Sequence, residues 1–76
     1  MDLPKVIDGL ILQAMIMTNP SRAADLLIRR ASTIRDTPLS RWPAGVTAWD
    51  VSAALDRLYM AARDIREAAG LRPLAA

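Results

Sequence analysis

The chain has 76 residues and contains neither cysteine nor histidine, and this combination constrains its fold more than any other feature. A chain of this length forms one domain and buries only about 60% of the surface that it exposes when unfolded. Small domains usually add disulfides, a structural metal or a partner subunit to such a thin core. The missing cysteines exclude a disulfide, and without histidine nearly every zinc site is excluded as well. We therefore expect a partner subunit to complete the core.

Hydrophobic residues make up 53% of the chain and charged residues 24%, which is typical of a folded protein. Apolar residues recur at spacings of three and four, which predicts helices. We predict an all-α fold, a small three-helix bundle completed by homodimerisation, with helices over residues 3–17, 20–35 and 48–69. The single helical domain spans residues 1–76, with a connection containing proline and glycine at 36–46 and a flexible C-terminal tail at 71–76.

Residues that start and stop helices support these ranges. Asp2 and Asn19 are suited to cap helix N-termini, and a proline follows each of them within the first turn. Thr47 and Asp50 have the spacing of a capping box, with aspartate in place of the more usual glutamate. Gly70 is a natural C-terminal cap for the third helix. In the connection, we expect a short helical turn.

Two large apolar side chains, Leu39 and Trp42, stand out in this connection. Leu39 and Trp42 lie among two prolines and a glycine, which favour an irregular path. We expect both side chains to fold back and cover the end of the core.

The first helix is apolar on almost every side. We predict that one of its faces packs inside the chain, formed by Leu3, Val6, Ile7, Leu10, Ala14 and Met17. Its narrow polar stripe is interrupted by further apolar residues, and the other two helices also carry apolar residues outside their core-facing rows. Five of these side chains cannot all point inward in so small a fold, and we predict that they form a protein interface: Leu12, Ile16, Leu26, Tyr59 and Met60. The outer face of the first helix is the preferred interface, and the apolar seam of the third helix is the alternative.

The sequence offers little chemistry for catalysis. The usual general base and the best nucleophile are absent, and the three glycines are too scattered to form a phosphate-binding loop. Asp64 and Glu67 lie one helical turn apart, but alternating charges at a helix end are typical of a solvated face. We therefore predict that the protein is not an enzyme and that it has no cofactor and no metal.

Positive charge is concentrated in the middle of the chain. Residues 20–45 carry a net charge of +3, residues 1–19 carry −1, and residues 46–76 are balanced. Five arginines account for the excess and form the alternative nucleic-acid contact: Arg22, Arg29, Arg30, Arg35 and Arg41. A solvated basic face is the preferred interpretation of this cluster, and an acidic partner surface is a further alternative.

No targeting or membrane-spanning segment is evident, since the longest apolar run is far shorter than the roughly 20 residues that cross a bilayer. We therefore expect a cytoplasmic protein that binds another protein and a second copy of itself, but no membrane. The hypothesis for its function is a small non-catalytic protein-binding regulator or inhibitor. Such short chains, with a composition typical of GC-rich coding, are common among accessory regulators and phage-encoded inhibitors. The alternatives are a helical DNA-binding transcriptional regulator that uses the arginines, and a structural subunit of a larger assembly.

Overall fold

The computed structural model describes residues 2–71, and within this range it contains three α-helices, one short 3-10 helix and no strand. The elements are α1 (Leu3–Ile16), α2 (Pro20–Asp36), η1 (Leu39–Arg41) and α3 (Ala48–Ala68). The predicted all-α three-helix fold is confirmed, and each predicted helix end is right to within one residue. Most of the predicted flexible tail at 71–76 lies outside the described residues.

Side-chain caps begin α1 and α2 where the sequence predicts them. The Asp2 carboxylate accepts a hydrogen bond from the Lys5 backbone N–H at 3.4 Å, and the Asn19 side chain accepts one from the Arg22 N–H at 3.1 Å. These bonds satisfy N–H groups that have no partner within their own helix. Both helix starts are therefore local consequences of the sequence.

The two ends of α3 are also set locally. Thr47 and Asp50 form a reciprocal capping box: the threonine hydroxyl accepts from the Asp50 N–H at 3.2 Å, and the aspartate accepts from the Thr47 N–H at 2.9 Å. At the other end, Gly70 has φ of +71°, which lets the chain turn back. The Leu71 N–H then donates to the Arg66 carbonyl at 2.9 Å.

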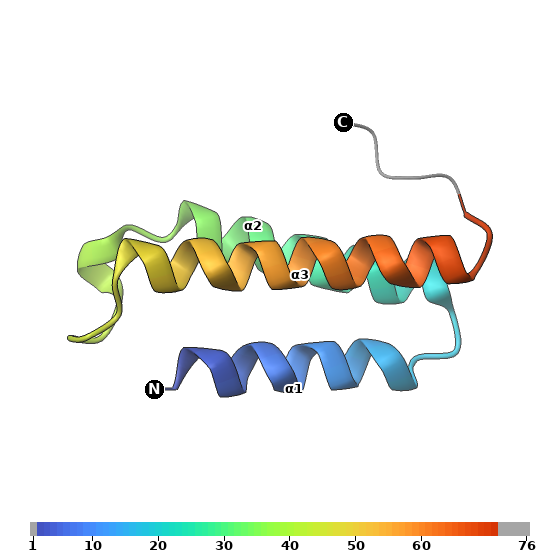
Figure 1. Ribbon diagram of the computed structural model, residues 1–76, viewed down its shortest axis with the longest axis horizontal. Coiled ribbons are helices and arrows are strands. Elements are labelled where there is room, and N and C mark those ends of the chain that lie inside the picture. Colours follow the sequence, from blue (N-terminus) through green and yellow to red (C-terminus); the bar gives the residue numbers. More distant parts are fainter. Residues whose placement is uncertain (1, 72–76) are drawn as a thin grey trace.

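The three helices run up, down and up, so that α1 and α3 are parallel to each other and α2 is antiparallel to both (Figure 1). A short turn joins α1 to α2, whereas the longer connection that contains η1 joins α2 to α3. The contact between α2 and α3 is the most extensive, and α1 packs less extensively against each of them. As a result, a large part of α1 remains uncovered.

The core consists of apolar side chains from all three helices. Ile7, Leu27 and Leu58 are fully buried, one from each helix, and no polar or charged residue is buried in the part of the chain that is described. Among residues 2–71, six of the eleven buried residues are alanines: Ala14, Ala23, Ala24, Ala31, Ala54 and Ala62. Small residues allow close approach of the helices, but they contribute little apolar area, so the core is thin, as the length predicts.

The connection closes one end of this core only in part as predicted. Its 3-10 turn, η1, is present where a helical turn is expected. Trp42 and Val46 pack against the core. Leu39, however, is 50% exposed, and the prediction that it covers the core is wrong. The larger tryptophan ring and Val46 already pack there, so Leu39 stays outside.

Candidate protein interface

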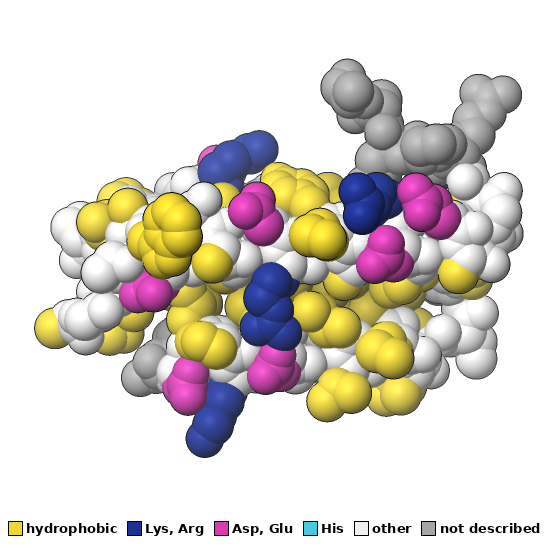
Figure 2. Space-filling view, in the orientation of Figure 1, with side chains coloured by type: hydrophobic (Ala, Val, Ile, Leu, Met, Phe, Trp, Pro, Cys, Tyr) yellow, Lys and Arg dark blue, Asp and Glu magenta, His cyan; other side chains and the backbone are white. Residues whose placement is uncertain are grey.

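Three apolar side chains lie exposed on the C-terminal half of α1. Leu12, Met15 and Ile16 are 61%, 67% and 81% exposed, and their spacing makes them neighbours on the helix surface. We call them the α1 patch. Apolar side chains gather over this half of α1 in the space-filling view (Figure 2). The largest apolar patch on a typical monomer, about 300–600 Å², is often functional.

The inner face of α1 explains why this patch points outward. Leu3, Ile7 and Ala14 are buried, whereas the prediction that Val6 belongs to the same face is wrong, because Val6 is 41% exposed. Adjacent helical residues lie about 100° apart, so Val6 falls at the edge of the row that contains Ile7. With α1 covered on one side only, its outer face remains accessible.

The other residues of the predicted interface lie on different elements. Met60 is 53% exposed on α3, whereas Leu26 on α2 and Tyr59 on α3 are half-buried, and Tyr59 packs against the core. Leu12 and Ile16 are thus the two predicted interface residues that the structure brings together.

The apolar seam of α3, the alternative interface, is used within the chain. Leu58 and Ala62 are buried, and Val51, Leu55 and Ile65 pack against the core. This seam is therefore covered largely by the chain's own helices, and the outer face of α1 is the more accessible of the two surfaces.

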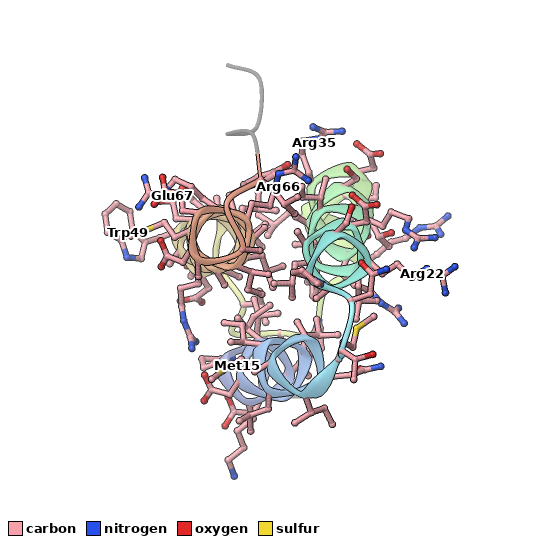
Figure 3. All side chains as sticks on the ribbon, turned by 90° about the vertical axis from the view of Figure 1, so that its right-hand side faces the viewer. Met15, Arg22, Arg35, Trp49, Arg66 and Glu67 are labelled. Atoms are coloured by element: carbon pink, nitrogen blue, oxygen red, sulfur yellow. The ribbon has the colours of Figure 1, made fainter. Side chains whose placement is uncertain are left out.

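Trp49 is a surface residue that the sequence reasoning missed. It occupies the first turn of α3 and is 81% exposed. Figure 3 shows that Trp49 and Met15 point toward the same side of the molecule. The sequence does carry a signal for its exposure: Trp49 precedes Leu58 by nine residues, or two and a half turns, which places it opposite the buried row. Exposed tryptophans are favoured at the centres of protein interfaces.

An ion pair bridges α1 and α3 on this side. The Arg57 guanidinium donates a hydrogen bond to the Asp8 carboxylate, and the two side chains are 45% and 57% exposed. Two open, largely apolar hollows lie on either side of the bridge. One lies between the N-terminal ends of the two helices. The other lies beside Met15, where the C-terminal ends of α1 and α3 meet the start of α2. The surface between α1 and α3 therefore holds two separate hollows rather than one continuous groove. Neither hollow contains a cluster of polar groups.

The five arginines do not form a single cluster. Three of them lie on α2 before its last turn: Arg22, Arg29 and Arg30. None of these three makes an ion pair in the described part of the chain. Arg35 points to another side of α2 than Arg22 (Figure 3) and pairs with the adjacent Asp36 at 3.3 Å. The remaining member, Arg41, lies on η1. Arg22 also lies on the side of the molecule opposite to Trp49 (Figure 3).

The carboxylates and the helices give no further site. Asp64 pairs with the neighbouring Arg63 at 3.7 Å, and both side chains are more than half exposed. Within residues 2–71, no three side chains of the metal-binding types are close enough to share an ion, and no helix has the length and apolar character needed to span a membrane.

Comparisons with protein-family models, with curated proteins and with solved structures gave no match for this chain.

Proposed function

We propose that this protein is a small, non-catalytic regulator or inhibitor that uses the α1 patch to cover a surface of another protein. The observation that carries the proposal is the patch itself: three adjacent, large apolar side chains that the chain's own fold leaves in water. Exposed apolar surface of this extent is characteristic of an interaction site. A cytoplasmic location is part of the proposal, since the cysteine-free chain needs no oxidising compartment.

The position of the patch suits binding by steric masking. Ile7 and Ala14 fix the opposite side of α1 in the core, so the patch is held in place before a partner arrives. Leu12 and Ile16 supply apolar area at its centre. Met15 beside them has a flexible thioether side chain that adapts to an irregular partner surface. The arginines of α2 lie outside this contact, and their expected contribution is long-range attraction of an acidic partner.

The proposal is tested with two charge substitutions and a matched control. Leu12→Asp and Ile16→Asp are expected to abolish binding to the partner protein, because each places a charge in an apolar contact. Helical content, measured by circular dichroism, is expected to remain because both positions are exposed. Leu39→Asp changes another half-exposed leucine, at the opposite end of the bundle from the patch.

The readout is a protein that co-purifies with the tagged wild-type chain and with the Leu39→Asp control, but with neither α1 variant. Binding that survives both substitutions would show that the patch is not the contact surface. Complete unfolding of both variants would show that these side chains belong to the core, and the proposal would be wrong.

A second candidate function, a helical DNA-binding regulator, is favoured by one observation. Arg22, Arg29 and Arg30 on α2 are three cations that form no ion pair with any residue from 2 to 71. Phosphate contacts from such cations give an affinity that falls steeply with salt. Under this alternative, the double substitution Arg29→Glu and Arg30→Glu removes nucleic-acid binding and lowers its salt dependence. A double variant with unchanged activity would eliminate this class.

A third candidate is a structural subunit of a larger assembly. It predicts a particle mass far above that of a dimer in the purified protein, with no other protein present. Light scattering on a size-exclusion peak separates this case from the other two.

A further inference from the structure

Four exposed residues of α1 follow one another along a single line of the helix surface. Lys5, Gly9, Leu12 and Ile16 are separated by four, three and four residues, and all four are exposed. This alternation of spacings is the pattern by which one helix packs along another. We call these residues the α1 row. It includes two members of the α1 patch and extends the surface toward the N-terminus of the helix.

Gly9 lies in the middle of this row, and the fold of the chain does not explain its presence. Its φ is not positive, unlike those of Gly45 and Gly70. A Cβ atom added at Gly9 would meet nothing within 4 Å. Glycine inside a helix lowers helix stability relative to alanine. What glycine uniquely permits at an exposed position is the close approach of another chain.

The row is complementary to itself when two copies run antiparallel. In one antiparallel register, the numbers of facing residues sum to 21. Leu12 of one copy then faces Gly9 of the other, and Lys5 faces Ile16. All four residues of the row then find a partner within the row, and the Leu12 side chain of each copy lies over the space that Gly9 of the other copy leaves open. A parallel arrangement would instead place Gly9 against Gly9 and the two Lys5 ammonium groups against each other.

Charge favours the same arrangement. The last turn of α1 contains no basic residue, although the carbonyl end of a helix attracts a cation. Lys5 makes no ion pair within residues 2–71. In the antiparallel pair, the stem of Lys5 crosses Ile16 of the other copy, and its ammonium group reaches the carbonyl end of that copy's α1. Each chain thus supplies the cation that the other lacks.

We infer that the α1 row binds a second copy of this chain, in a two-fold symmetric dimer whose α1 helices pack antiparallel across Gly9. A contact along one face of a 14-residue helix is smaller than the roughly 800 Å² that each partner buries in a stable complex, so the dimer is weak and forms at high protein concentration. The inference rests on the proposed function, because it assigns an occupant to the same face. The second copy and the partner protein then compete for that face, and self-association regulates its availability.

The geometry is tested by disulfide trapping, for which the natural absence of cysteine is an advantage. Lys5→Cys and Ile16→Cys chains are mixed in a thiol redox buffer. In the antiparallel dimer these two positions are adjacent, whereas two copies of position 16 lie roughly 16 Å apart along the helices. A disulfide needs Cα atoms within about 7 Å. The mixed disulfide is therefore expected to dominate. Predominance of either homodisulfide, or a purely statistical mixture, would overturn the arrangement.

The association itself is tested by sedimentation equilibrium over a wide concentration range. The wild-type mass is expected to rise from 8.3 kDa toward twice that value. Gly9→Gln keeps the charge and favours the helix but fills the space, so this variant is expected to stay monomeric with unchanged helical content. Leu39→Asp is the control and is expected to dimerise like the wild type. A wild-type chain that remains monomeric at every concentration, or a Gly9→Gln chain that dimerises equally well, would overturn the inference.

These outcomes are separable from those of the proposed function. A monomeric wild type whose partner binding is still lost on Leu12→Asp refutes the dimer and leaves the proposed function standing. A dimer that is lost on Gly9→Gln, together with partner binding that survives Leu12→Asp and Ile16→Asp, supports the dimer and refutes the proposed function.

Discussion

Replacing Gly9 with alanine is expected to make the folded monomer more stable. The residue lies within α1, its φ is not positive, and an added Cβ atom would meet nothing within 4 Å. The substitution therefore adds no clash and removes the conformational freedom that glycine gives the unfolded chain. In a helix interior this difference is about 0.8–1.0 kcal/mol in the free energy of unfolding. For a domain of this size, such a gain raises Tm by about 4–8 °C.

The assay is thermal and urea denaturation followed by circular dichroism, at the lowest workable protein concentration so that the monomer is observed. Gly45→Ala serves as the matched control, because Gly45 has φ of +94°. Alanine in that left-handed conformation is unfavourable, and the control is expected to lose roughly 1–2 kcal/mol. Replacing glycine with alanine is thus expected to raise the free energy of unfolding at position 9 and to lower it at position 45.

A loss of stability in Gly9→Ala would refute the reasoning, since it would mean that the Cβ atom meets a neighbour or that α1 is not helical at this position. A gain in the monomer combined with weaker dimerisation at high concentration is the result expected if Gly9 serves contact between two chains.

Three further substitutions test the fold. Leu27→Ala empties a fully buried position and is expected to lower the free energy of unfolding by about 2–5 kcal/mol in a urea titration; a loss below about 1 kcal/mol would place Leu27 outside the core. Thr47→Ala removes one half of the capping box and is expected to cost about 1 kcal/mol, and an unchanged urea midpoint would contradict the cap. Asp8→Asn weakens a half-exposed ion pair, so a loss of only about 0.2–1 kcal/mol, smaller at high salt, is expected; a loss that salt does not reduce would contradict an electrostatic origin.

The sequence by itself determined the number, class and limits of the helices. Asp2, Asn19 and the Thr47–Asp50 box act on N–H groups three residues away, and Gly70 acts on its own backbone. Such signals operate within one helical turn, so they can be read without knowledge of the rest of the molecule. The exposed positions of Leu12 and Ile16 were also predictable, because they interrupt the polar stripe of α1.

Only the tertiary structure decided which apolar side chains each helix buries. A helix that is apolar on nearly all sides has no single preferred inner face, so Val6 and Met15 could be placed only once α2 and α3 covered one side of α1. Arg57 and Asp8 are 49 positions apart, and nothing local indicates their pairing. At the end of the core, Trp42 and Val46 pack against the buried residues, whereas Leu39 is exposed. Burial depends on the volume that distant segments leave free, and that volume exists only after the helices have packed.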